Sequence, residues 1–392
     1  MIADLHAHYA MHLVAKRESI WKLVGTPRGE ARWRDRARAL LVGLASRFGN
    51  YRSLFSGPRV TMPGLREGDV RVVLSVLYSF FDELELGEEY PARPKRGYLD
   101  SMLGQIELVE RDLEDNHRAT AVAVTTPEAL AEALGGERVA FVHCVEGGFH
   151  LGSTPAEVDE AVSTLARRGV AYITLAHLLW RHVATNTNAV PFLSDDLYRR
   201  WFPQPDEGLS ELGRAAVRAM LREGVLIDLS HMSGRSLADT FELLDALDPE
   251  KTRPVVASHA CFRFGTQEYG VDEPTLRRVA ERGGVVGLIL AQHQLRDGVS
   301  GPSGRGLDAS FQVIRAHVNR MAEITGSHEH IAIGSDFDGF IKPTMAGLES
   351  MSDMAELEKR LASEYGEPAA EQICSGNVLR VLQTGWGRGL EV

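Results

Sequence analysis

The sequence has few cysteines, no long apolar run and a deficit of basic residues. Of its 392 residues only three are cysteines, Cys144, Cys261 and Cys374, and none forms a C-x-x-C pair. An odd number of scattered cysteines excludes a disulfide-stapled scaffold and favours a reducing compartment. No stretch approaches the ~18–20 apolar residues of a membrane span, and the opening MIADLHAHYAMH has charges and histidines where a signal peptide would be apolar. We therefore expect a cytoplasmic protein that does not associate with membranes.

The charge balance is acidic. Lysine and arginine number 43 and aspartate and glutamate 54, which gives a net charge of −11 at pH 7. Nucleic-acid binding needs a basic surface, so no nucleic-acid partner is expected. The composition is otherwise that of a globular domain with a large core, at 44% hydrophobic and 25% charged residues. A small molecule is the expected partner.

Short apolar runs alternate with amphipathic segments along the chain. VRVVLSVL and GGVVGLIL are continuous apolar runs, which are typical of strands buried on both faces. Between such runs, TPAEVDEAVSTLARRG opens with a helix start at Thr154 and Pro155 and ends at Gly169. Eight strands are expected, at Met1–Asp4, Val70–Leu77, Arg138–Val142, Val170–Leu175, Val225–Leu229, Pro254–Ala257, Gly284–Leu290 and His330–Ile333. Their alternation with helices predicts a single α/β domain over residues 1–392, a TIM-like (β/α)8 barrel.

Two connections are too long for simple loops between a strand and a helix. Residues 9–69 follow the first strand and include RGEARWRDRARALLVGLASRF, whose arginines favour a solvated or packing helix over a phosphate or partner site. Residues 178–209 follow the fourth strand and carry two tryptophans and three prolines. In a barrel such insertions lie on the catalytic face, where long ones often form lids.

Polar residues gather at the ends of the predicted strands. His6 and His8 follow the first strand, and alternation along an extended chain places them on the same side. Five more residues stand at other strand ends: Glu146, His177, His231, His259 and Asp336. One such histidine would usually be a hydrogen-bonded core residue, but this many buried ionisable groups are costly unless they are paired or bound to metal. Because barrel strand ends meet at one mouth, the pattern predicts a metal centre.

Neighbouring polar residues are weaker candidates. His143 and His150 compete as ligands, but the first lies within a strand and the second lies past the turn. His12 is expected on a helix surface. Asp228 either orients a neighbouring ligand or pairs with the backbone, and Asp338 either shapes its loop or touches substrate.

The ligand types indicate which ion would bind. Imidazole with carboxylate suits zinc or a similar divalent transition ion rather than calcium. Glu146 alone would more often cap a helix, but five ligands exceed the needs of one tetrahedral ion. Two ions bridged by Glu146 would use them all, with His6 and His8 on the first. His231 and His259 would hold the second.

Two ions ~3.5–4 Å apart can hold and deprotonate a water between them. Asp336 would then accept the proton and pass it to the leaving group. His177 would stabilise the developing oxyanion.

The motifs that carry these residues resemble those of the membrane (renal) dipeptidases, peptidase family M19, among the amidohydrolase-like metal-dependent hydrolases. The matching elements are DLHAH, EGG, TLAH, GLSELG, IDLSHMS, ASHACFR, GSDFDG and SGNVLRVL. The resemblance is patchy over 9–69 and 178–209. It implies a TIM-like barrel with two zinc ions bridged by a glutamate and ligands at positions matching His6, His8, Glu146, His231 and His259. Positions matching His177 and Asp336 would bind substrate and transfer protons.

This sequence departs from the family pattern at two places. The family usually has aspartate at the position of His8, so the histidine removes one negative charge from the first metal site. The family also has an Arg-Asn pair downstream of the SH motif for the substrate carboxylate, where Tyr269 and Gly270 stand here. Tyrosine cannot supply the charged fork of arginine, which disfavours dipeptides with a free C-terminus. Arg263 matches another family arginine and, with Tyr269, is expected near the substrate.

Three functions compete. The first is a binuclear metallohydrolase that cleaves an amide bond in a dipeptide or N-acyl amino acid, and that could form a homodimer. The second has the same architecture but acts on a lactone, a cyclic amide or an ester. The third is a barrel that binds metal or ligand without turnover, which the presence of Asp336 and His177 disfavours.

Overall fold

The computed structural model describes residues 1–15, 32–33, 58–83, 90–190, 193–300, 306–339 and 344–391. Most of the first predicted insertion, including the arginine-rich stretch apart from residues 32–33, lies outside the described residues.

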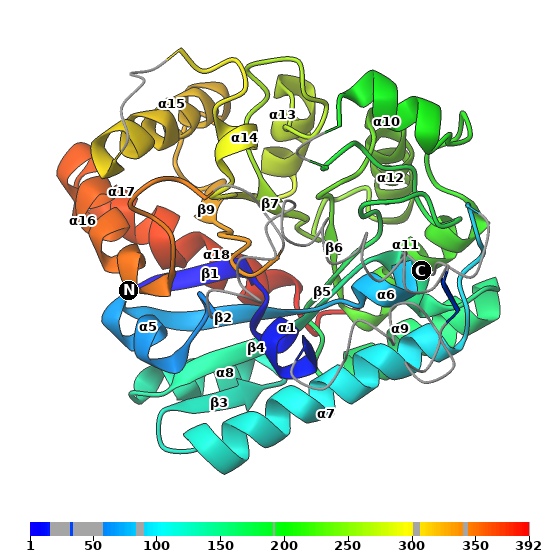
Figure 1. Cartoon of the computed structure of the whole chain (residues 1–392), viewed down its shortest axis with the longest axis horizontal. Coiled ribbons are helices and arrows are strands. Elements are labelled where there is room, and N and C mark those ends of the chain that lie inside the picture. Colours follow the sequence, from blue (N-terminus) through cyan, green and yellow to red (C-terminus); the bar gives the residue numbers. More distant parts are fainter. Residues whose placement is uncertain are drawn as a thin grey trace.

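Parallel strands form a closed barrel (Figure 1). The strands are β1 Ile2–Ala7, β2 Val70–Leu77, β3 Ala121–Val124, β4 Val139–Glu146, β5 Tyr172–Thr174, β6 Leu226–Asp228, β7 Val256–Ala260, β8 Val285–Leu288 and β9 Ile331–Ile333. Their order in the sheet is β2-β1-β9-β8-β7-β6-β5-β4-β3, and pairing of β2 with β4 closes an eight-stranded ring. β3 adds to the first half of β4. The TIM-like α/β barrel is therefore confirmed.

The helices follow the strands and surround them (Figure 1). Their bounds are α1 Tyr9–Ala15, α5 Met62–Glu67, α6 Phe80–Glu83, α7 Gly97–His117, α8 Pro127–Gly135, α9 Pro155–Arg167, α10 Asp195–Trp201, α11 Glu211–Glu223, α12 Gly234–Leu247, α13 Glu273–Glu281, α14 Gln292–Leu295, α15 Leu307–Thr325, α16 Met354–Tyr365, α17 Glu367–Glu371 and α18 Asn377–Gly385. The predicted start of α9 is confirmed, because the Thr154 side chain accepts from the Glu157 amide and Pro155 is the first helical residue.

The barrel has apolar packing at the end where the strands begin. Val378 and Val381 of α18 share one buried cluster with Leu74, Val142 and other strand residues. The helix contacts β1, β8 and β9. Polar side chains are thereby left to the opposite end, where the strands finish.

The strand bounds shift by a few residues from the prediction, with β1 ending at Ala7 and β7 at Ala260, and three larger features also differ. The run AVAV forms β3, an additional strand too short to stand out as a buried run. β4 continues four residues beyond Val142 and ends at Glu146, because His143 and Glu146 interrupt the apolar pattern without ending the strand. A third long connection, from β2 to β3, carries α6 and α7.

The three cysteines are free and buried, so no disulfide joins them. Among the described residues, none of the helices combines the length and apolar character that a membrane span requires.

Candidate metal centre

The seven polar residues predicted at strand ends lie together at one mouth of the barrel. His6 and His259 lie within β1 and β7, and Glu146 is the last residue of β4. The other four follow the ends of β1, β5, β6 and β9: His8, His177, His231 and Asp336. All seven are buried, none more than 7% exposed.

One half of the cluster is built from β1 and the loop after β9. Nε2 of His6 lies 3.2 Å from Nε2 of His8. Oδ1 of Asp336 lies 3.2 Å from Nε2 of His8 and 3.8 Å from Nε2 of His6. The carboxylate of Glu146 completes this group, with Oε1 3.4 Å from His6 and Oε2 3.6 Å from His8.

The other half comes from β6, β7 and the loop after β5. Nε2 of His231 lies 2.9 Å from Nε2 of His259. Oε1 of Glu146 lies 3.5 Å and 3.3 Å from these two atoms. Nε2 of His177 faces the second oxygen of Glu146 at 3.4 Å. Glu146 is thus the one carboxylate shared by both halves.

These residues fit two divalent metal ions. Zinc–ligand bonds of ~2.0–2.1 Å in a tetrahedron give ligand–ligand separations of ~3.3 Å, close to the spacings within each half. Space for an ion is also kept beside the first group, since a Cβ at Gly339 would lie 1.8 Å from Asp336 Oδ1 and 2.6 Å from His8 Nε2. The barrel therefore holds two candidate buried metal sites.

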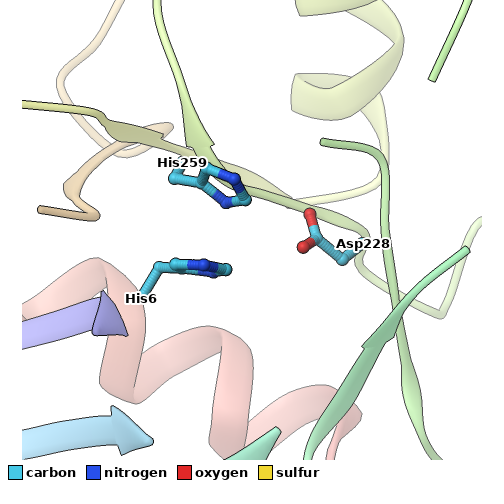
Figure 2. Close-up of side chains that lie close together, drawn as sticks. All are labelled: His6, Asp228 and His259. Carbon is cyan, nitrogen blue, oxygen red and sulfur yellow. The ribbon is translucent and has the colours of Figure 1, made fainter. Parts of the chain in front are cut away.

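A third possible grouping, His6, Asp228 and His259, is shown in Figure 2. Both oxygens of Asp228 already accept hydrogen bonds, from Ser230 and Ser258 on one and from Thr174 and Ser258 on the other. Its carboxylate accepts from the Ser258 hydroxyl, which contacts Nδ1 rather than Nε2 of both rings. Asp228 therefore supports ligands rather than adding a third ion site.

Burial and neighbouring charges oppose one another in the cluster. Burial alone would raise the pKa of Glu146, but His177 and His6 hold that pKa well below its ordinary value. Burial raises the pKa of Asp336. For His177 burial lowers the pKa, but Glu146 and Glu83 outweigh it and raise the pKa to about 9. Burial lowers the pKa of His231 and His259, which favours the neutral imidazoles that bind metal.

Two of the seven residues have backbone conformations that side chains rarely adopt. His231 has φ 65° and Asp336 φ 54°. Left-handed conformations are uncommon outside glycine and cluster at functional sites, where the surrounding structure holds them. In these turns the side chain of His231 faces Glu146 and that of Asp336 faces His8.

Glu83 of α6 is a buried site residue that the sequence analysis missed. Its Oε2 lies 2.7 Å from Nδ1 of His177 and accepts from the Tyr78 hydroxyl at 2.7 Å, and Oε1 accepts from the Leu179 amide at 2.8 Å. The signal available was a carboxylate six residues past the second strand, in FFDELELGEE, but five acidic residues there gave no means of choosing one.

The weaker candidates lie outside the cluster. His143 points toward Glu110 of α7, with Nε2 3.6 Å from its carboxylate. Nδ1 of His150 bonds to the carbonyl of Gly147. His12, expected on a helix surface, instead contacts Asp338 at 2.8 Å.

Asp338 forms hydrogen bonds and an ionic contact with neighbouring segments of the chain. It accepts hydrogen bonds from the amides of Arg59 and Val60, and it contacts His12. Its carboxylate therefore links the chain before α5 to the loop after β9. Of the two interpretations left open for Asp338, the structure favours shaping the loop.

Arg263 and Tyr269, predicted near the substrate, lie in the loop after β7. The guanidinium of Arg263 donates to the carbonyls of Gly270 and Glu268. The buried Tyr269 hydroxyl donates to the carbonyl of His259, and its ring packs edge-on against His231. Tyr269 thus contacts two of the candidate ligands, and Arg263 braces the loop that carries Tyr269. Contact of either residue with substrate stays a prediction.

A closed parallel barrel with five histidines around one buried glutamate at its C-terminal mouth defines a TIM-like barrel protein with a candidate binuclear metal centre. The model of the family "Membrane dipeptidase (Peptidase family M19)" matches residues 50–385. The chain belongs to this family, and the resemblance inferred from its motifs is confirmed.

Two curated relatives are similar in sequence. An uncharacterized dipeptidase, C965.12, of Schizosaccharomyces pombe is 30% identical over 65% of this chain and 55% of its own. Dipeptidase verJ of Clonostachys rogersoniana is 28% identical over 73% of this chain and 65% of its own. The matched region thus spans less than two thirds of either relative.

Two solved structures share the fold. Dipeptidase AC, a metallopeptidase of family M19, has a TM-score of 0.71 at 19% identity, with 98% of each chain covered. A metallopeptidase from Rhodobacter sphaeroides, in complex with a phosphinate mimic of L-Ala-D-Ala, has a TM-score of 0.69 at 19% identity, covering 98% of this chain and 99% of its own. At this identity the likeness shows the fold alone.

Proposed function

We propose that this protein is a binuclear zinc hydrolase that cleaves the amide bond of a dipeptide or an N-acyl amino acid. One observation carries the proposal. The carboxylate of Glu146 lies within 3.3–3.6 Å of the Nε2 atoms of five histidines at the mouth of the barrel, and so many buried ionisable groups are costly unless they are paired or bound to metal. Membership of the membrane dipeptidase family supports the reaction class.

The ligand roles follow from the two halves of the cluster. His6 and His8 would hold one ion, His231 and His259 the other, and Glu146 would bridge them. Ions held in this way would supply an activated water and would polarise the substrate carbonyl. Imidazole and carboxylate ligands favour zinc.

Two residues of the chain are then left for the chemistry. Asp336 lies beside His8 and can accept a proton from the attacking water and return it to the leaving amine. His177 faces Glu146 through Nε2 and can donate a hydrogen bond to the carbonyl oxygen as its charge develops.

Substrate choice is the finer part of the proposal. The solved Rhodobacter sphaeroides relative holds a mimic of a dipeptide, which supports a dipeptide-sized substrate. The guanidinium of Arg263 is engaged by two backbone carbonyls, and Tyr269 stands where the family has its carboxylate-binding pair. Dipeptides with a blocked C-terminal carboxylate therefore belong in the first round of assays, beside free dipeptides and N-acyl amino acids. A lactone, a cyclic amide or an ester remains the alternative.

The test combines metal analysis with a substrate panel. Purified protein is expected to bind close to two zinc ions per chain, and His231→Ala to bind fewer. Zinc-loaded protein is then assayed on L-L and L-D dipeptides, N-acyl amino acids and lactones, with and without a chelator. Chelator-sensitive cleavage of amides supports the proposal, and cleavage of lactones alone supports the alternative. Absence of bound metal, with His231→Ala indistinguishable from wild type, would exclude the metal centre. The cytoplasmic location and the homodimer stay predictions.

A further inference from the structure

A buried hydroxyl links the two halves of the candidate metal centre through the Nδ1 atoms of two ligand histidines. Oγ of Ser258, in β7, lies 2.9 Å from Nδ1 of His6 and 2.9 Å from Nδ1 of His259. Figure 2 shows these two rings one above the other with Asp228 beside them, and their centroids are 3.7 Å apart. His6 belongs to the first half of the cluster and His259 to the second, so one serine contacts a ligand of each.

The direction of the serine proton is fixed by Asp228. Its carboxylate accepts five hydrogen bonds: from the Ser230 amide and hydroxyl, the Ser258 amide and hydroxyl, and the Thr174 hydroxyl. An ionised carboxylate only accepts, so the Ser258 hydroxyl must donate its single proton to Asp228, at 2.5 Å. Its two lone pairs are then directed to the two imidazoles.

It follows that both imidazoles donate from Nδ1. A neutral histidine has one N–H, and a proton on Nδ1 leaves Nε2 with the free lone pair that a metal needs. His6 has a second acceptor in the Tyr172 hydroxyl, at 2.8 Å, whose own proton goes to the carbonyl of Leu5. Within the described part of the chain, Ser258 is the side chain that accepts from His259 Nδ1.

We propose that Ser258, held by Asp228, is a positioning residue that fixes the Nδ1–H tautomer of His6 and His259 together and so presents both Nε2 lone pairs to the two metal ions. The proposal depends on the metal centre of the proposed function. The other two ligand histidines differ, because Nδ1 of His8 and of His231 has no hydrogen-bond partner in the described residues. Control of the tautomer is thus applied to one ligand of each ion. Mutation of groups that orient metal ligands in this way typically lowers metal affinity by 10–100-fold.

The test uses tautomers and metal affinity rather than turnover. In the metal-free, 15N-histidine-labelled protein at alkaline pH, where the imidazoles are neutral, NMR should show His6 and His259 as Nδ1–H tautomers. In Ser258→Ala, His259 should populate both tautomers, whereas His6 should keep its tautomer through Tyr172. In zinc titrations against a competing chelator, Ser258→Ala should weaken one of the two equivalents by about 10–100-fold and the other less. In Tyr172→Phe, Ser258 should still hold His6 as the Nδ1–H tautomer, and the double variant Ser258→Ala/Tyr172→Phe should lose that preference.

Ser335→Ala is the matched control. Ser335 is a second buried serine whose hydroxyl donates to a buried aspartate, Asp4, but its hydroxyl does not contact an imidazole Nδ1. Ser335→Ala should keep the wild-type tautomers of His6 and His259 and the wild-type affinities for both zinc ions. If Ser258→Ala does not fold, Ser258→Cys offers a similar volume with a weak acceptor.

The proposal is overturned if wild-type His259 is the Nε2–H tautomer. It is also overturned if the folded Ser258 variant, alanine or cysteine, keeps the wild-type tautomers and binds both zinc ions as tightly as wild type does. Failure of the proposed function looks different. In that case wild type binds no zinc, while the NMR tautomers still decide whether Ser258 sets the proton positions.

Discussion

Nδ1 of His177 lies 2.7 Å from Oε2 of Glu83, while Nε2 of the same ring lies 3.4 Å from Oε2 of Glu146. The histidine is therefore held between two carboxylates, one from the connection after β2 and one from the end of β4. With Nδ1 bonded to Glu83, the ring can turn only by losing that bond. Nε2 is kept at the mouth of the barrel, where the proposed reaction needs a hydrogen-bond donor.

We expect Glu83→Gln to lower kcat by about 10–100-fold with a smaller change in KM, because His177 is proposed to stabilise charge that appears only in the transition state. Glutamine has the shape of glutamate but a single acceptor oxygen, so it can accept from Nδ1 of His177 or from the Leu179 amide and not from both. The similar shape should keep the fold. Steady-state kinetics on zinc-loaded protein measure the effect. Glu110→Gln is the control, since Glu110 faces His143 and Arg168 away from the metal centre. An equal loss in both variants would contradict the role of Glu83.

Asp336→Asn should keep two zinc ions per chain and lose turnover by about 10²–10⁴-fold, the usual size of a general-base contribution. Asparagine tolerates the left-handed backbone at this position, where φ is 54°, so the turn should survive. Metal analysis and kcat are measured on the same preparation. A variant that loses metal together with activity would assign Asp336 to ligation, and a fully active variant would remove its proton-transfer role.

The barrel and its seven-residue mouth were predictable because they follow from local patterns. Continuous apolar runs such as VRVVLSVL mark buried parallel strands, and such strands finish at one end of a barrel. A polar residue directly after such a run is therefore placed by topology without knowledge of packing. Glu146 and His231 could be brought together in this way although 84 residues separate them in the sequence.

Residues that act through tertiary contacts were not predictable in the same way. Glu83 lies on a short helix whose acidic residues look alike in sequence, and only the position of His177 selects it. The pairing of His12 with Asp338 depends on how the loop after β9 returns to β1. In the sequence Ser258 is an ordinary strand residue. Its role depends on the contacts of its hydroxyl with Nδ1 of His6 and Nδ1 of His259, which only the structure gives.

His8→Asp tests the departure from the family pattern. A carboxylate adds negative charge to the first site, so zinc should bind that site more tightly, by about 10-fold or more. The same charge lies near Glu146 and Asp336, so the metal-free protein should have a lower Tm. Titration against a chelator and thermal unfolding with and without zinc measure the two effects. His8→Asn changes the shape without the charge and should not gain affinity. Tighter binding in both variants, or in neither, would show that charge at position 8 does not set the affinity.

His317 of α15 should make stability depend on pH independently of the metal centre. Its Nδ1 accepts from the Phe262 amide at 3.1 Å, and its Nε2 donates to the carbonyl of Leu295 at 2.8 Å. Burial lowers the pKa of His317 to about 4, below the 6.5 of an exposed histidine. The neutral ring is therefore favoured by folding, and its contribution is complete above pH 6.5 and decreases as the pH falls toward 4.

We expect urea unfolding of the metal-free wild type to lose on the order of 3 kcal/mol from this group between pH 7 and pH 4. His317→Gln should be less stable at pH 7 but should lose less stability over that range, so the difference between the two proteins should shrink as the pH falls. His328→Gln is the control, because burial also lowers the pKa of the more exposed His328. It should show the same sign with a smaller amplitude. A difference between wild type and His317→Gln that is constant from pH 7 to pH 4 would mean that His317 is not held neutral by the fold.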